Sequence, residues 1–196
     1  LNQVYFSHIQ DKCPLSKLYY AFQPMAGYRC IVLDGYEIST IGPITPEYGH
    51  HAEDLLRQRN HNYATGSTDW LHNLADENLR YLPFNGGISP QQLEWLEAQL
   101  LDAVQNNERC LLFSHMAIYR PASQEQNLLW NSEEILKVLH ATPKGTVISL
   151  ISGHDHDGGF ATDSHGIHHI VPCSPIECDE GEMSFGVIEI YAKEQC

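Results

Sequence analysis

The stretch TVISLISGHDHDGG, residues 146–159, decides how the rest of the chain is interpreted. Its first half is a short apolar run typical of a buried strand, and its second half places His154 and His156 directly after that strand. The flanking glycines permit unusual φ angles, and neutral imidazole is a common ligand for transition-metal ions. The alternative is a polar turn, because Asp and Gly are typical turn residues. The position just after a buried strand favours a metal site.

A second strand with the same arrangement precedes this one. A strand is predicted at 109–113, where Arg109 precedes four apolar residues, and Ser114-His115 stands just beyond it. A helix that begins near Asn131 with a capping-box pattern separates the two strands. This spacing predicts a βαβ unit, which brings both strand ends to one edge of a parallel sheet. We therefore predict an α/β fold in which His115, His154 and His156 converge as metal ligands.

The flanking sequence predicts further elements of the same single domain, residues 1–196. An apolar run predicts a strand at 28–33, Thr45 and Pro46 open a helix that reaches about Asn60, and residues 62–84 are irregular. Ser89 caps another helix, with Pro90 first and Gln92 in the capping-box position. Two antiparallel strands are predicted at 167–171 and 184–191.

The other histidines do not predict a second metal site. His168 and His169 are adjacent in a strand and must point to opposite faces, so they do not share an ion. His169 remains a candidate for a residue that contacts a metal ligand without binding the metal itself. We predict surface positions for four other histidines, which are His50, His51, His61 and His72.

Composition restricts the class of partner. The chain has 11 Lys plus Arg against 25 Asp plus Glu, and its formal net charge of −14 repels nucleic acid and anionic membranes. A small phosphorylated substrate is compatible with this charge where bound metal ions supply positive charge locally. No apolar run approaches the length of about 18 residues that crosses a bilayer. The six cysteines contain no C-x-x-C pair, and a reduced, cytoplasmic protein is expected.

Two short segments carry a resemblance to a known family. Phe113-Ser114-His115, followed by Gly153-His154-Asp155-His156, resembles the last two motifs of the calcineurin-like metallophosphoesterases. The sequence is most similar to one branch, the manganese-dependent ADP-ribose/CDP-alcohol diphosphatases. The likeness runs in order over nearly the whole chain and includes residues 22–36, 85–96, 114–119, 128–131, 153–159 and 166–170.

The resemblance implies a four-layer α/β/β/α sandwich and a binuclear centre, with manganese as the expected divalent metal. It implies hydrolysis of the pyrophosphate bond of ADP-ribose, CDP-choline and similar nucleotide diphosphate derivatives. Carried over to this sequence, the metal ligands are His115, His154 and His156. Asn131 and Asp157 are implied as contacts to the substrate or to the ligands. The protein is expected to be a monomer.

The sequence also departs from the family pattern. The family uses an upstream Asp-x-His or Asp-x-Gln pair, a Gly-Asp-x-x-Asp motif and an Asn-His-Glu motif, and none of these occurs here. The chain therefore resembles the C-terminal part of the enzyme, with an incomplete N-terminal half. Three neutral imidazoles do not balance the charge of two divalent ions, so weak binding of a single ion and little activity are expected. One face of the sheet should also be incompletely covered.

Three interpretations of function stay open on the sequence. The chain is a fragment of an active diphosphatase, a non-catalytic paralogue that binds nucleotides, or a related phosphodiesterase with another substrate. Coding sequence upstream of Leu1 distinguishes the first two, because an active enzyme needs the acidic motifs.

Overall fold

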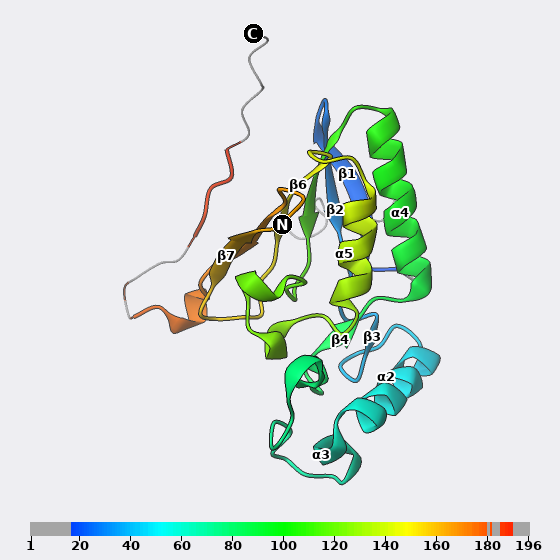
Figure 1. Ribbon diagram of the computed structural model, residues 1–196, viewed down its shortest axis with the longest axis vertical. Coiled ribbons are helices and arrows are strands. Elements are labelled where there is room, and N and C mark those ends of the chain that lie inside the picture. Colours follow the sequence, from blue (N-terminus) through cyan, green and yellow to red (C-terminus); the bar gives the residue numbers. More distant parts are fainter. Residues whose placement is uncertain (1–16, 180, 182–184, 190–196) are drawn as a thin grey trace, which may run out of the picture.

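A six-stranded sheet organises the computed structural model, which describes residues 17–179, 181 and 185–189. The four central strands are parallel, and an antiparallel strand closes each edge. The spatial order is β1 (Tyr20–Met25), β2 (Tyr28–Val32), β5 (Arg109–Phe113), β6 (Val147–Ile151), β8 (His168–Val171) and β7 (Gly159–Thr162) (Figure 1). The predicted α/β class is confirmed, and β5 and β6 are adjacent parallel strands as the βαβ spacing indicates.

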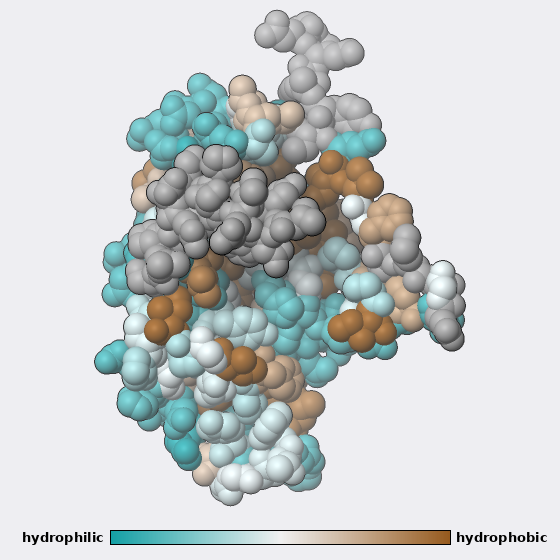
Figure 2. All heavy atoms as spheres, turned by 180° about the vertical axis from the view of Figure 1, so that it is seen from behind, coloured by the Kyte–Doolittle hydropathy of each residue, from teal (hydrophilic) through white to brown (hydrophobic). Residues whose placement is uncertain are grey.

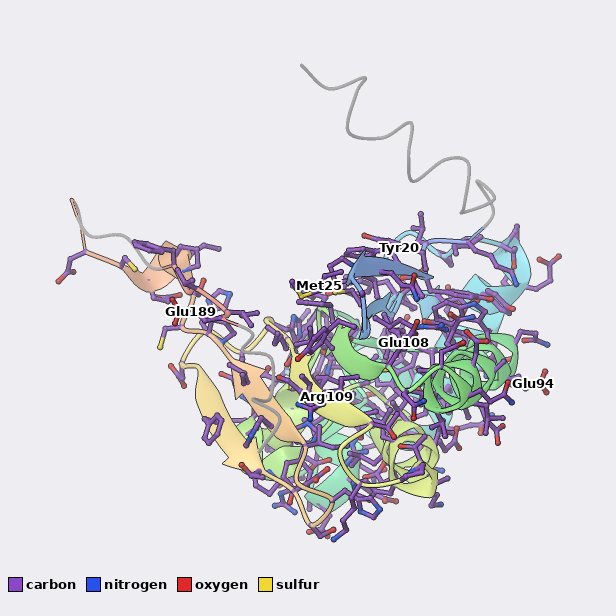
Figure 3. The ribbon with its side chains drawn as sticks, turned by 90° about the horizontal axis from the view of Figure 1, so that it is seen from above. Tyr20, Met25, Glu94, Glu108, Arg109 and Glu189 are labelled. Carbon is purple, nitrogen blue, oxygen red and sulfur yellow. The ribbon has the colours of Figure 1, made fainter. Side chains whose placement is uncertain are left out.

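Two helices cover one face of this sheet. They are α4 (Pro90–Gln105) and α5 (Ser132–Ala141), which lie side by side in Figure 1. Their apolar residues, such as Leu96 and Ile135, form a continuous core with Ile31, Leu112 and Leu150 of the strands. Burial of each such side chain contributes about 1.5–3 kcal/mol, so this layer holds the strand ends in place. Glu94 lies on the opposite side of α4 and points to solvent (Figure 3).

The start of α4 follows the prediction with one difference. The Ser89 hydroxyl accepts a hydrogen bond from the Gln92 backbone N–H at 3.1 Å, as an N-cap does. The Gln92 side chain does not complete a capping box, because it bridges to the backbone of Asp34 instead. The carboxylate of Glu37, 4% exposed, accepts from the Ser89 N–H at 2.8 Å in its place.

The predicted capping box at the start of α5 is wrong. The Asn131 side chain makes no capping hydrogen bond to the helix. Its carbonyl oxygen accepts from the Ile88 N–H at 3.1 Å, and its amide donates to the Ile88 carbonyl at 2.9 Å. The Asn131 side chain therefore pairs with the backbone of Ile88 as a neighbouring strand would. These two hydrogen bonds connect the start of α5 to the segment before α4.

A smaller layer lies beyond the carboxyl ends of the strands, at the lower end of Figure 1. It contains a two-stranded sheet, β3 (Ile38–Ser39) with β4 (Gly86–Gly87), and the helices α2 (Pro46–Arg59) and α3 (His61–Ala64). The predicted helix from Thr45 is confirmed. The predicted irregular segment 62–84 holds the end of α3 and one turn, η1 (Asp76–Arg80). Further short turns are η2 (Arg120–Ala122), η3 (Glu125–Asn127) and η4 (Pro175–Glu177).

The C-terminal region differs from the predicted antiparallel pair. β8 pairs in parallel with β6 and in antiparallel fashion with β7, which the sequence did not indicate as a strand. Of the predicted strand at 184–191, Ser184, Ile190 and Tyr191 lie outside the described residues, and residues 185–189 are not in a strand. Polar alternation over 159–162 is weak, and this explains why β7 was missed.

The second face of the main sheet carries an apolar hollow of about 470 Å³. Ile188 lies against it, and Phe160 on this face is 63% exposed. Apolar residues reach the surface in several places when the molecule is seen from behind (Figure 2). The hollow fits the expectation that this face is incompletely covered. The lining residues are Tyr28, Arg109, Leu111, Ile148, Ser149, Ile151, Phe160, His168, Ile170, Ile188 and Glu189.

The two ends of the sheet differ in chemistry. At the amino-terminal end of β5, labelled by Glu108 and Arg109 in Figure 3, Glu108 forms a buried ion pair with Arg29 at 2.7 Å. Burial raises the pKa of the neighbouring Cys110 thiol to about 12, which disfavours the reactive thiolate. The carboxyl ends of β5 and β6 carry the histidines instead.

Candidate metal centre

Two backbone hydrogen bonds join the loops that follow β5 and β6. The Ser114 N–H donates to the Ile151 carbonyl at 3.1 Å, and the Gly153 N–H donates to the His115 carbonyl at 2.8 Å. These bonds extend the parallel pairing past the strand ends. They fix His115 and His154 as neighbours, at the place where open α/β sheets bind ligands.

The two imidazoles face each other. His154 Nδ1 lies 3.2 Å from His115 Nε2, and the ring centroids are 5.1 Å apart at an interplanar angle of 67°. His115 is exposed and His154 is half-buried. The Tyr36 ring lies 5.6 Å from the His115 ring, and the Phe84 ring lies 5.9 Å from the His154 ring. Aromatic side chains therefore flank a pair of nitrogen donors.

The backbone of His154 is strained. Its φ of +69° lies in the left-handed region, which a residue with a side chain seldom adopts. Asp155, which is buried, holds this turn, because its Oδ2 accepts from the Ser123 hydroxyl at 2.7 Å and from the Gln124 N–H at 3.0 Å. The unusual φ predicted for the flanking glycines is found at Gly158 (+74°) and at the histidine itself.

Both imidazoles are held in the neutral form. Burial, together with the nearby His115 and His156 when they are charged, lowers the pKa of His154 to about 4. Burial and His156 also lower the pKa of His115. Near neutral pH both rings offer a lone pair rather than a positive charge, as a metal ligand must.

His156 is directed differently from the other two. Its Nδ1 lies 2.9 Å from Glu177 Oε1, and its side chain is 46% exposed. Within the described ranges, no group of three His, Cys, Asp or Glu residues is placed to hold one metal ion. The structure therefore brings His115 and His154 together and turns His156 toward η4.

The donor set matches part of a transition-metal site. Two neutral imidazoles with converging nitrogens suit such an ion, whereas a divalent ion also needs ligands that carry negative charge. Two buried oxygens at the same sheet edge, Asp34 Oδ2 and Ser114 Oγ, have no hydrogen-bond partner among the residues described. Burial raises the pKa of Asp34, which marks a carboxyl without a compensating charge.

The two residues implied as substrate contacts lie in different places. Asp157 is exposed beside the histidine loop, and its Oδ2 accepts from Gln124 Nε2 at 3.0 Å. Asn131 lines a separate hollow with Trp130 and Tyr81, and its amide is bonded to Ile88.

The contact of Asn85 with His154 is not predicted by the sequence. Asn85 Oδ1 lies 2.8 Å from His154 Nε2, and Asn85 is fully buried. The Asn-Gly-Gly segment at 85–87 is typical of a turn, and that interpretation hides the role of the side chain. A long-range contact of this kind, 69 residues apart, has no periodic signal in the sequence.

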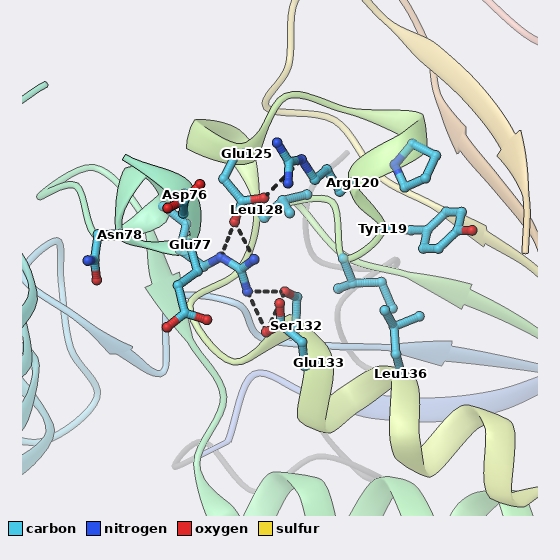
Figure 4. Close-up of a pocket in the computed structure, with 13 residues that line it drawn as sticks. Asp76, Glu77, Asn78, Tyr119, Arg120, Glu125, Leu128, Ser132, Glu133 and Leu136 are labelled. Atoms are coloured by element: carbon cyan, nitrogen blue, oxygen red, sulfur yellow. Dashed lines mark hydrogen bonds and ion pairs between the residues drawn. The ribbon is translucent and has the colours of Figure 1, made fainter. Parts of the chain in front are cut away.

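A hollow of about 610 Å³ contains a buried ion network (Figure 4). Arg80 binds Glu125 through its Nε at 2.6 Å, and it donates through Nη1 to Ser132 Oγ at 2.7 Å and to Glu133. Arg120 lies 3.5 Å from the same Glu125. Because Arg80 is saturated by carboxylates, the network supports the loop before Asn85 and is not a free anion site.

His169 belongs to a different cluster from the metal candidates. Its Nε2 lies 3.1 Å from Asp163 Oδ2, and His140 Nε2 lies 2.7 Å from the same oxygen. The His169 ring stacks on Tyr119 at 4.5 Å. His168 points to the other face and is exposed, as predicted.

Asp163 makes stability depend on pH. Burial alone would raise its pKa, but hydrogen bonds from His140, His169 and two backbone N–H groups lower it to about 2, against 3.8 for a free carboxyl. A depressed pKa stabilises the fold above 3.8, and this contribution is lost as pH falls toward 2. The stability difference between the wild type and Asp163→Asn should shrink by about 2 kcal/mol over that window. Urea unfolding at a series of pH values measures it, and a constant difference would contradict the assignment.

Comparison with known proteins identifies the relatives of this chain. It is 37% identical over 174 residues to a manganese-dependent ADP-ribose/CDP-alcohol diphosphatase of Arabidopsis thaliana, covering 88% of this chain and 54% of that protein. The Danio rerio protein of that name is 37% identical over 88% of this chain and 52% of its own length, and the Homo sapiens protein is 32% identical over 94% and 52%. No family model matches the chain.

A solved structure shows the same relation in three dimensions. The crystal structure of a dimetal phosphatase from Danio rerio superimposes with a TM-score of 0.78 at 36% sequence identity, over 85% of this chain and 52% of that one. The chain thus spans about half the length of the proteins it matches. The metallophosphoesterase-like α/β fold implied by the resemblance is confirmed for that half. Among the described helices, none combines the length and hydrophobicity that a membrane span requires.

Proposed function

From the homology of this chain to half of the manganese-dependent ADP-ribose/CDP-alcohol diphosphatases, we propose that its protein is a metal-dependent hydrolase of nucleotide diphosphate derivatives. ADP-ribose, CDP-choline and other CDP-alcohols are the proposed substrates, cleaved at the pyrophosphate bond. The observation that carries the proposal is the converging pair His115 Nε2 and His154 Nδ1, 3.2 Å apart at the adjoining ends of β5 and β6.

His115, His154 and His156 are the proposed ligands of a divalent ion, with Mn²⁺ as the proposed metal. A bound metal pair supplies hydroxide near neutral pH and offsets charge on the phosphoryl oxygens. The chain itself holds the neutral imidazoles of His115 and His154 in a fixed orientation, with the rings of Tyr36 and Phe84 beside them. His156 would have to leave the exposed Glu177, and breaking an exposed contact of this kind costs less than about 1 kcal/mol. No residue is assigned as catalytic acid or base.

This chain by itself should bind metal weakly. Neutral nitrogen donors provide no negative charge for a second divalent ion, and the described residues offer no carboxylate among the converging donors. We expect isothermal titration with Mn²⁺ to show a single weak site and the chain to hydrolyse ADP-ribose negligibly. Two tight sites per chain would contradict the proposal that the family's acidic motifs are required.

Asp157 and Asn131 are the proposed contacts to substrate. Asp157 is the better placed, since it is exposed in the histidine loop. Asn131 has a lone pair left on its side-chain oxygen after its bond to Ile88, while its amide also donates to Glu134 Oε2 at 3.4 Å. Alanine at either position should raise KM with little change in kcat if the contact is made equally in the ground and transition states.

Hydrolysis of a substrate panel tests the function. The protein encoded by the complete transcript is incubated with ADP-ribose, CDP-choline and a cyclic nucleotide, with and without Mn²⁺. The proposal expects metal-dependent release of AMP and CMP from the first two. Preferred cleavage of the cyclic nucleotide would favour the related phosphodiesterase, and absence of turnover with retained nucleotide binding would favour the non-catalytic paralogue.

The coding sequence upstream of Leu1 separates the fragment from the paralogue. Upstream Asp-x-His, Gly-Asp-x-x-Asp and Asn-His-Glu motifs would restore the carboxylates that the histidine pair lacks. A translation start near Leu1 would contradict the diphosphatase proposal for this gene product. A monomeric state and a cytoplasmic location are proposed alongside, and light scattering of the purified protein tests the first.

A further inference from the structure

We propose that Asn85 is a positioning residue that fixes the ring orientation and the tautomer of His154, so that His154 Nδ1 is the atom offered to a metal ion. The tautomer follows from hydrogen bonds within the described chain. Its consequence for metal binding rests on the proposed function.

Both amide protons of Asn85 are already used. Its Nδ2 donates to the Arg80 carbonyl at 2.8 Å and to the Gln126 carbonyl at 2.7 Å. A carbonyl oxygen can only accept a hydrogen bond, so each of these two must face an N–H donor. The reversed amide orientation would place the Asn85 side-chain oxygen against both carbonyl oxygens, with no proton between them. The side-chain oxygen of Asn85 must therefore be the atom that faces His154.

That oxygen decides where the imidazole proton lies. Asn85 Oδ1 can only accept, and it lies 2.8 Å from His154 Nε2. His154 Nε2 must therefore carry the proton in the neutral ring. The lone pair is left on Nδ1, which points at His115 Nε2, 3.2 Å away. Metal-bound histidines commonly have their second nitrogen bonded to an acceptor in this way.

The position of Asn85 is held rigidly. It is fully buried, and its backbone N–H donates to the Leu82 carbonyl at 3.0 Å. The next residue, Gly86, accepts from the Trp130 N–H at 2.9 Å, and a Cβ at Gly86 would lie 2.4 Å from the Gly35 carbonyl. This close packing, with the two hydrogen bonds donated by Nδ2, fixes the Asn85 side-chain oxygen toward His154 Nε2. The glycines at 86 and 87 thus serve the placement of Asn85 as well as a turn.

An aspartate or a leucine would not replace Asn85. Aspartate retains the acceptor but loses both donors to the two carbonyls, and leucine retains neither. The backbone of His154 is held at a strained φ of +69°. Its ring is held by the hydrogen bond to Asn85 Oδ1, so loss of this acceptor would leave the ring free to rotate. Loss of such a partner usually weakens metal affinity by about 10–100-fold.

Asn60 provides a matched control. It is also fully buried, and its Nδ2 donates to two backbone carbonyls, Trp70 O at 3.1 Å and Tyr81 O at 2.8 Å. Its oxygen accepts only backbone N–H groups of α3. Asn60→Ala and Asn85→Ala therefore remove the same kind of side chain, and only the second touches His154.

Nitrogen-15 NMR of the metal-free chain tests the proposal directly. Spectra are recorded near about pH 8, above the ordinary histidine pKa of about 6.5. The wild type should show His154 protonated at Nε2 and unprotonated at Nδ1. Asn85→Ala should give a mixture of tautomers, and Asn60→Ala should match the wild type. A wild-type ring protonated at Nδ1, or an Asn85→Ala spectrum identical to the wild type, would overturn the proposal.

The wild-type spectrum decides the tautomer even where Asn85→Ala does not fold. Mn²⁺ titration of the same samples separates the two proposals. Weakening by about 10–100-fold in Asn85→Ala alone supports the positioning role. The predicted tautomer with no Mn²⁺ binding to any sample would contradict the metal centre and leave the Asn85 contact established.

Discussion

Replacing His154 with alanine is expected to weaken Mn²⁺ binding by more than about 100-fold, beyond the range seen when a residue behind a ligand is lost. His115→Ala should do the same, because each ring supplies one of two nitrogens that face a common point. The reason is geometric: either variant removes one of the two facing nitrogens. Counting free Mn²⁺ by electron paramagnetic resonance measures the affinity. In the protein encoded by the complete transcript, the Mn²⁺-dependent hydrolysis of ADP-ribose should fall in parallel.

His168→Ala is the control for this experiment. His168 is exposed on β8 and its Nδ1 lies 2.9 Å from Thr162 Oγ1, so its removal does not affect the pair. Its Mn²⁺ affinity should equal that of the wild type. Equal losses in all three variants would indicate nonspecific binding to histidines, and no loss in His154→Ala would place the metal elsewhere.

Arg80→Ala is expected to destabilise the fold by about 3–5 kcal/mol, because it leaves the buried carboxylate of Glu125 without its partner. Arg80 is 4% exposed and Glu125 is 7% exposed, and the pair joins η1 to η3 (Figure 4). Chemical denaturation followed by circular dichroism gives the free energy of unfolding. The Arg80 carbonyl also holds Asn85, so His154 should become more mobile in this variant.

Two further variants show whether the burial of the Arg80–Glu125 ion pair causes the expected loss of stability. Arg57→Ala removes an exposed helical pair with Glu53 at 3.9 Å and should cost less than about 0.5 kcal/mol. Replacing Arg80 by methionine together with Glu125→Leu removes both buried charges and should recover most of the stability. A similar loss in the double variant would show that the network contributes through its geometry rather than through charge balance.

The sequence predicts the parts of this fold that depend on local patterns. The predicted strands at 109–113 and 146–152, with a helix between them, give β5, α5 and β6 and the meeting of His115 with His154. Periodicity along a helix and alternation along a strand are local signals, and the start of α4 at Ser89 is read in the same way. The family resemblance extends these predictions to the metallophosphoesterase-like fold, which the structural comparison supports.

The contacts that the sequence does not predict join distant residues. Glu37 completes the cap at Ser89, Asn85 holds His154, and Arg80 is buried with Glu125. In each case a polar side chain is satisfied by a partner more than 40 residues away, and no spacing rule links such pairs. Asn131 shows the converse: its local pattern indicates a cap, but two hydrogen bonds to Ile88 compete successfully for its amide.

The placement of a bound ion tests the central claim most directly. Crystals of the protein grown with Mn²⁺ and measured at the manganese absorption edge locate the metal by anomalous scattering. The account predicts a peak within about 2 Å of both His115 Nε2 and His154 Nδ1, close to the usual metal–imidazole distance. A manganese peak bound to neither nitrogen, with this pair still facing each other, would contradict it.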